Sequence, residues 1–190
     1  QTCVSPNRVF VQAGVHDRFV EKLGARIAAL KVGPASDEGS QIGPMINAKA
    51  VDKIERHVKD AVEGGARVVV GGKRLAALGP NFFAPTLLVG ADATMACSCE
   101  ETFGPVVPVT RFETEAEVIA EANGTPFGLA AYFYSRDVKR IWRVADALEA
   151  GLIGINEGAL AAEAAPFGGI KESGYGREGG RHGLAAYLAP

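Results

Sequence analysis

The sequence has few cysteines, few aromatic residues and almost no excess of charge. Aromatic residues make up 7% of its 190 residues and the formal net charge is −2, so it lacks the basic field that would hold a nucleic acid or an anionic membrane. No apolar run approaches the roughly 20 residues that a membrane-spanning helix needs. Three cysteines without a secretory signal indicate free thiols in a reducing compartment, and we expect a cytoplasmic protein.

Two further absences limit the kind of site. Cys97 and Cys99 form a C-x-C pair, but no second cysteine or histidine cluster lies near them in the sequence. Zinc sites need four such ligands at recognisable spacings, so we expect no metal. The first residue is Gln1 rather than methionine, and we expect the chain to start inside a longer protein.

Short runs of β-branched residues alternate with stretches whose apolar residues recur at helical spacing. This pattern predicts a three-layer α/β fold, with a mostly parallel sheet and helices on both faces. No linker divides residues 1–190, so we expect one partial domain, incomplete at both ends. The expected strands are residues 8–12, 67–70, 83–89, 106–112, 129–134 and 151–156; the expected helices are 15–30, 48–63, 115–122, 138–150 and a short one at 178–187.

A glycine motif near the end resembles a dinucleotide fingerprint and should be rejected. Gly174, Gly176 and Gly179 match G-x-G-x-x-G. That motif works between a strand and a helix, with an acidic residue about 20 positions later that holds a ribose. We expect no strand directly before it, and the sequence has too few residues after it for the acidic partner. A surface turn is the better interpretation.

Cys3 is the first candidate for chemistry. A single cysteine is usually an inert small hydrophobic residue. Cys3, however, stands in a polar segment just before an expected strand, where a side chain can face a cleft. A thiolate there would be a strong nucleophile if backbone N–H groups or a cation lowered its pKa.

Two further segments have compositions that suit a binding site. Glu100 and Glu101 precede an expected strand, and two adjacent buried acids would be costly, so we expect one to face solvent and one a polar ligand. A Gly-Pro turn then fixes the direction of Phe103. Near the end, rigid proline and permissive glycines surround Phe167 and favour a loop that presents one aromatic wall. Each segment could also be an ordinary surface turn.

Together these segments resemble the aldehyde dehydrogenase superfamily. The matching motifs are QTC at 1–3, EETFGPV at 100–106 and PFGGIKESGYGRE at 166–178, and they occur in the family's order and near its spacing. The resemblance runs over essentially the whole chain and is most similar to the succinate-semialdehyde dehydrogenase group. It implies the cysteine-bearing part of the catalytic domain, without the nucleotide-binding domain.

The resemblance also implies roles for individual residues. Cys3 would be the nucleophile that forms a thiohemiacetal and then a thioester with a small aldehyde. Glu101 would hold the nicotinamide ribose of NAD or NADP, Phe103 would pack beside it, and Phe167 would line the aldehyde channel. The family's oxyanion asparagine and general base are not in this chain, so we expect the chain alone to be inactive. The full-length enzyme is expected to be a homo-oligomer, a dimer or tetramer.

The sequence departs from the group at two points. Ser5 stands where some members carry a second cysteine, so a redox-switch disulfide is not expected. The loop at 158–163 lacks the serine that helps to hold a substrate carboxylate. Glutarate or 2-oxoglutarate semialdehyde is therefore an alternative to succinate semialdehyde. A non-enzymatic structural or binding module and an acyl-transferring thiol enzyme without nicotinamide also stay open.

The three histidines match nothing catalytic in the family. We expect His16, His57 and His182 to be surface or capping residues.

Overall fold

A computed structural model describes residues 1–160 and 162–188, and the chain divides into two compact units, Gln1–Thr114 and Glu115–Pro190. Expectations that fall on Ala161, Ala189 and Pro190 lie outside the described residues. The predicted α/β class is confirmed in both units. Of the helices in the described ranges, none combines the length and the hydropathy that a bilayer crossing requires.

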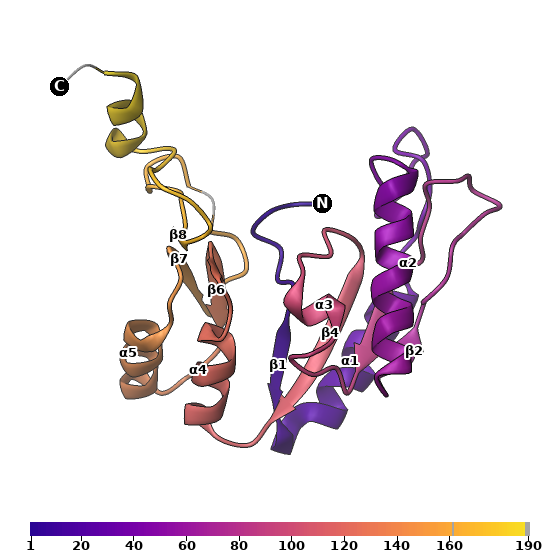
Figure 1. Cartoon of the computed structure of the whole chain (residues 1–190), viewed down its shortest axis with the longest axis horizontal. Coiled ribbons are helices and arrows are strands. Elements are labelled where there is room, and N and C mark those ends of the chain that lie inside the picture. The colour runs from indigo at the N-terminus through magenta and orange to yellow at the C-terminus, as the bar shows by residue number, and fades with distance from the viewer. Residues whose placement is uncertain (161, 189–190) are drawn as a thin grey trace. The chain divides into compact units, whose positions relative to one another are not determined.

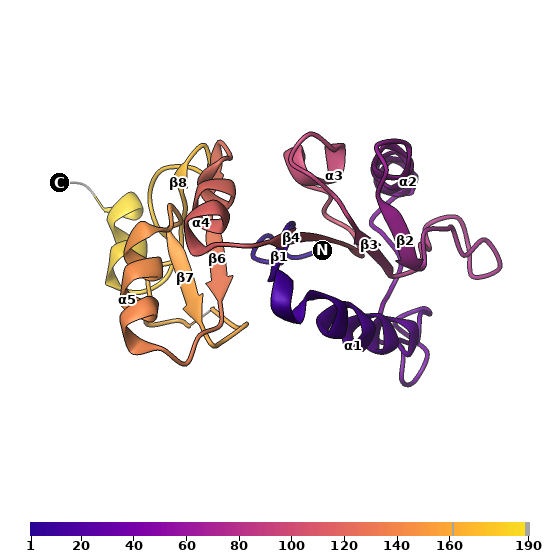
Figure 2. The ribbon, with the colours of Figure 1, turned by 90° about the horizontal axis from the view of Figure 1, so that it is seen from below.

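The first unit is built on a four-stranded sheet in the order β1-β4-β3-β2 (Figure 1 and Figure 2). β4 lies parallel to both β1 and β3, whereas β2 pairs antiparallel with β3, so the sheet is mixed and mostly parallel. The unit's elements are β1 (Val9–Gln12), η1 (Ala13–Val15), α1 (His16–Ala28), α2 (Ala48–Glu63), β2 (Arg67–Val70), β3 (Thr86–Val89), α3 (Ala96–Cys99) and β4 (Val106–Phe112).

Helices cover both faces of this sheet, as the alternating pattern predicts. α1 lies on one face, and α2 and α3 lie on the other (Figure 2). The strand period of two explains the arrangement, since Leu87 packs with the α1 side and Leu88 with the α2 side. Each side chain is fully buried, which contributes roughly 1.5–3 kcal/mol per residue.

α2 has clear sequence signals at both ends and along its length. The Asn47 side chain accepts a hydrogen bond from the Ala50 N–H at 2.9 Å, which satisfies a free donor of the first turn. Gly65 ends the helix with φ +102°, a conformation that side-chain-bearing residues rarely adopt. Apolar residues at helical spacing face the sheet between these ends: Val51, Ile54, Val58 and Ala61.

The second unit holds two small sheets. β6 pairs parallel with β7, and β5 pairs antiparallel with β8. Its elements are α4 (Glu115–Asn123), β5 (Phe127–Gly128), β6 (Ala130–Phe133), α5 (Val138–Ala147), β7 (Leu152–Ile155), β8 (Ile170–Lys171) and η2 (Arg181–Tyr187).

The structure differs from the sequence-based expectations at a few element ends. β3 begins at Thr86 rather than 83, because Phe83 makes only an isolated bridge to Arg74 ahead of Pro85. Three short elements were not expected: α3, β5 and β8 are too short to show a hydrophobic period. β8 ends shortly before Gly174, contrary to expectation, but it is antiparallel and two residues long, so it forms no βαβ unit.

Candidate functional site

Cys3 lies in the segment that leads into β1, and its thiol is free and exposed. A tight turn forms here, in which the Ser5 N–H donates to the Thr2 carbonyl at 3.0 Å. The segment is anchored at its start, because the Gln1 Oε1 accepts a hydrogen bond from the Ile46 N–H at 3.1 Å. The sulfur is therefore accessible and is not sealed in the apolar core.

The other two cysteines have different environments. Cys97 is fully buried against the α2 side of the sheet, and burial raises the pKa of its thiol. Cys99 is exposed, and its Sγ donates to the Ala93 carbonyl at 2.9 Å. Burial thus makes Cys97 a poor nucleophile, whereas Cys3 and Cys99 are both reachable from solvent.

Residues 100–104 form a strained turn that packs on α2. Thr102 is buried, while Phe103 is 38% exposed, and the φ of +53° at Phe103 is unusual for a bulky residue. Such a conformation costs of order 1–3 kcal/mol and persists only where its surroundings hold it. Gly104 lies so close to α2 that an added Cβ would stand 2.4 Å from the Ile54 Cδ1, so a larger residue would require the Ile54 side chain to move.

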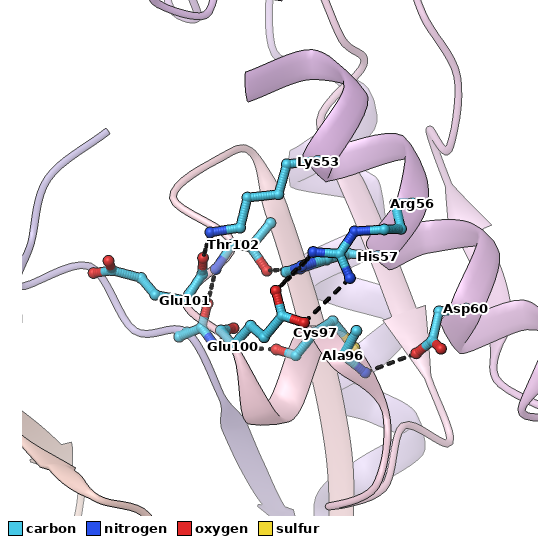
Figure 3. A network of polar contacts seen from close by, with 10 residues as sticks. Lys53, Arg56, His57, Asp60, Ala96, Cys97, Glu100, Glu101 and Thr102 are labelled. Carbon is cyan, nitrogen blue, oxygen red and sulfur yellow. Dashed lines mark hydrogen bonds and ion pairs between the residues drawn. The ribbon is translucent and has the colours of Figure 1, made fainter. Parts of the chain in front are cut away.

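The two adjacent glutamates of this turn face different surroundings. Glu100 accepts hydrogen bonds from Arg56, at 3.1 Å from Nη1 and 2.7 Å from Nη2, and its Oε2 lies 3.2 Å from the His57 Nε2. Arg56 first, and His57 second, lower the pKa of the Glu100 carboxyl to about 2. The Glu101 carboxylate is exposed and points away from these ion pairs, while its backbone carbonyl accepts from Lys53 (Figure 3).

His57 is not the surface or capping residue that the sequence analysis expects. It is fully buried, with its Nδ1 3.0 Å from the Thr102 Oγ1 (Figure 3). Burial lowers its pKa despite the opposing hydrogen bond to Glu100. The sequence signal for this burial is spacing, because His57 stands three residues after Ile54 and four before Ala61 on the buried stripe of α2.

The buried histidine should make stability pH-dependent. The charged groups that face it are Lys53, Arg56 and Glu100. The pKa of His57 in the folded state lies below its ordinary value of 6.5, so the unfolded chain binds a proton first as the pH falls. The free energy of unfolding is thus highest above pH 6.5 and declines as the pH drops towards the folded-state pKa.

Hydrogen exchange of the α2 amides, measured between about pH 7.5 and about pH 5.5, tests this expectation after correction for intrinsic exchange rates. As the pH is lowered over this range, the exchange protection of the α2 amides should decrease in the native protein and should decrease much less in His57→Gln. The ion pair of Glu100 does not interfere, because its stabilisation is lost only below pH 4.5, as the pH approaches about 2. An identical pH dependence in both proteins would contradict the assignment.

Asn7 connects the segment of Cys3 with the turn of Glu101. Its Nδ2 donates to the carbonyls of Cys97 and Glu100, both at 3.0 Å, and its Oδ1 accepts from the Thr102 N–H at 2.9 Å. The first unit therefore brings three of the four predicted site residues into two joined segments: Cys3, Glu101 and Phe103.

Phe167, the fourth, belongs to the second unit. Its backbone pairs with Glu178 through two hydrogen bonds of 2.7 Å. Its half-buried side chain lines a cavity of about 750 Å³ within that unit. Arg177 closes the loop by donating to the Gly169 carbonyl at 3.0 Å. The rejected glycine motif thus forms part of a turn around this cavity.

The types of side chain that the first unit exposes are suited to binding a nicotinamide nucleotide. Glu101 offers an exposed carboxylate, which accepts hydrogen bonds well from a ribose diol. Phe103 offers a partly exposed ring on a turn whose conformation is fixed by packing. Among the described residues no three His, Cys, Asp or Glu side chains gather as a metal site would require.

Fold and site define the class: an α/β protein with an accessible thiol, tied to a rigid turn that bears an exposed acid. Residues 1–190 match the aldehyde dehydrogenase family, and the chain belongs to that family. The family predicted from the three motifs is thereby confirmed.

The chain is similar to two kinds of semialdehyde dehydrogenase. It is 55% identical over 188 residues to a glutarate-semialdehyde dehydrogenase of Pseudomonas putida, with 99% of this chain and 38% of that protein covered. It is 56% identical over 188 residues to the NADP+ succinate-semialdehyde dehydrogenase GabD of Escherichia coli, covering 99% and 39%. A crystal structure of succinate-semialdehyde dehydrogenase from Burkholderia pseudomallei has a TM-score of 0.97 at 52% identity, covering 100% and 39%. The chain thus spans less than two fifths of the length of these relatives.

Proposed function

We propose that this chain is the cysteine-bearing part of an NAD(P)-dependent aldehyde dehydrogenase that oxidises a small semialdehyde to its acid. One observation carries the proposal: the thiol of Cys3 is exposed, and its segment is hydrogen-bonded to the turn that presents Glu101. The family relationship supplies the reaction class. The nucleotide is bound mainly by a domain outside this chain.

The chemistry at Cys3 is covalent. Its thiolate attacks the aldehyde carbon, a C–S bond forms, and the carbonyl π electrons move to the oxygen. The backbone N–H of Cys3 is one donor for the resulting oxyanion. When bound, a nicotinamide held by Glu101 and Phe103 would supply the two-electron acceptor for the hydride of the tetrahedral carbon. Water then cleaves the thioester, which releases the acid and restores the thiol.

The substrate is a carboxylate-bearing semialdehyde. Relatives named for succinate and for glutarate semialdehyde are almost equally similar, so both chain lengths are candidates. Residues 158–163 include no hydroxyl that could hold the carboxylate, so glutarate or 2-oxoglutarate semialdehyde is kept as an alternative to succinate semialdehyde. We propose Phe167 as a wall of the aldehyde channel. Comparison of kcat/KM for the four-carbon and five-carbon semialdehydes decides between them.

The compartment and the oligomeric state of the enzyme are part of the proposal. Three free cysteines are consistent with a reducing compartment, and we propose a cytoplasmic enzyme. The full-length protein is proposed to be a homo-oligomer, a dimer or tetramer, as in its family.

Thiol labelling of the full-length enzyme tests the function. Iodoacetamide should modify Cys3 faster than Cys97, which is buried with a raised pKa, and faster than exposed Cys99. NAD(P) should alter the rate at Cys3 alone, because it binds beside that segment. Peptide mass spectrometry over time measures each site. Equal rates at Cys3 and Cys99, with no response to NAD(P), would instead favour a non-enzymatic module on the same scaffold.

A further inference from the structure

The side chain of Asn7 is fully engaged with the backbone around Glu101. Both donor contacts of its amide go to carbonyls, those of Cys97 and Glu100, and its oxygen accepts from the Thr102 N–H. This pattern fixes the orientation of the amide, because the amide oxygen has no hydrogen to donate to the two carbonyls. The contacts at Glu100 and Thr102 lie directly before and after Glu101.

Among side chains of this length, asparagine alone could make the same set of contacts. The two carbonyls and the one N–H around it require two N–H donors and one acceptor on a short side chain. Asparagine has these groups, and aspartate, serine and alanine do not. Asn7 also stands four residues after Cys3 and two before β1, on a segment that the sheet holds in register with β4. It therefore links the position of Cys3 with the position of Glu101.

We propose that Asn7 is a positioning residue for hydride transfer. It fixes the backbone on both sides of Glu101, and thereby sets where the Glu101 carboxylate stands relative to the Cys3 segment. This inference rests on the proposed function, in which Glu101 holds the ribose while a substrate carbon is bonded to Cys3. Hydride transfer depends steeply on donor–acceptor geometry, so a loosened turn slows that step more than it weakens binding.

The strained conformation of the same turn explains why hydrogen bonds from another segment are needed to hold it. Phe103 has φ +53°, and an unrestrained turn would relax from this conformation. Gly104 and Thr102 hold the far side of the turn against α2 through packing on Ile54 and the hydrogen bond to His57. Asn7 holds the other side, through its hydrogen bonds to the Glu100 carbonyl and the Thr102 N–H.

The test compares Asn7→Ala with a matched asparagine in the full-length enzyme. Asn123 makes hydrogen bonds of the same kind in the second unit, since its Nδ2 donates to the Ala147 carbonyl at 2.8 Å and its Oδ1 accepts from the Glu149 N–H at 2.9 Å. Single-turnover formation of NAD(P)H should slow about tenfold to a hundredfold in Asn7→Ala and change little in Asn123→Ala. Thiol labelling of Cys3 should persist in both variants, which shows that the nucleophile segment is intact.

A double-mutant cycle with Glu101→Gln separates positioning from general damage. If Asn7 acts through Glu101, Asn7→Ala slows hydride transfer far less in the Glu101→Gln background than in the native one. Equal slowing in both backgrounds would overturn the proposal, and so would an equal loss in Asn123→Ala. Asn7→Asp, which keeps only the acceptor for Thr102, should show the same coupling and replaces Asn7→Ala if that variant does not fold.

The cycle also distinguishes failure of this proposal from failure of the function on which it rests. If Glu101→Gln alone leaves hydride transfer unchanged, the role given to Glu101 is wrong, and the positioning role falls with it. If Glu101→Gln slows the step but Asn7→Ala does not, only the role of Asn7 is wrong.

Discussion

Replacing Cys3 by alanine in the full-length enzyme should abolish aldehyde oxidation and leave NAD(P) binding nearly unchanged. The thiolate supplies the bond through which every later step passes, so its removal should lower kcat/KM by on the order of 10⁴-fold or more. Cofactor binding should survive, because alanine fits the exposed position of Cys3 without disturbing the hydrogen bonds of Gln1 or Asn7.

The matched control for this experiment is Cys99→Ala. Cys99 is also exposed and free and belongs to the same unit, but its contact is a single hydrogen bond to the Ala93 carbonyl. Its replacement should leave turnover close to that of the native enzyme. NAD(P)H absorbance follows activity and fluorescence titration follows cofactor binding. Substantial turnover in Cys3→Ala would end the case for a covalent mechanism at this residue.

Replacement by glutamine should have different effects at the two neighbouring glutamates. Glu101→Gln should slow hydride transfer about tenfold to a hundredfold, because a neutral amide is a weaker partner for the ribose diol than a carboxylate. The KM for the aldehyde should change much less. Glu100→Gln should leave the chemical step nearly intact and instead reduce stability slightly, since the partly exposed Glu100 carboxylate pairs with the exposed Arg56 and contacts the ring of the buried His57.

Single-turnover kinetics and urea unfolding of both variants measure the two effects separately. The pair is an internal control, because the two positions are adjacent and the substitution is identical. If Glu100→Gln slowed hydride transfer as much as Glu101→Gln, the assignment of a cofactor role to Glu101 alone would be wrong. The Arg56 and His57 contacts would then have to be interpreted as part of the cofactor site.

Much of the fold could be predicted from periodicity and local signals. The bounds of α2, β2 and β4 agree with the sequence-based ranges, because a helical apolar stripe, a capping asparagine and terminal glycines mark α2, and short β-branched runs mark the strands. The sequence did not reveal α3, β5 or β8, which are shorter than the repeat that would expose them. The division at Thr114 also lacks a composition signal.

For the candidate site, sequence motifs provided the residues but not their relationships. Local composition drew attention to Cys3 and to the Glu100–Glu101 pair, and the family resemblance assigned the cofactor role to Glu101 and left Glu100 structural; these roles stay predictions. Local composition misjudged His57, because a histidine in a polar stretch is usually solvated, and here tertiary packing buries it beneath Thr102.

By itself, the sequence determined the α/β class, the family and the set of side chains that could carry thiol chemistry, because these depend on periods and motifs within short windows. The tertiary structure decided which of the two glutamates is bound in ion pairs and which is exposed. It also decided that Asn7 holds the turn near Cys3. Those relationships are made by contacts between residues 43 to 95 positions apart in the chain, from His57 with Glu100 to Asn7 with Thr102, which no local pattern can encode.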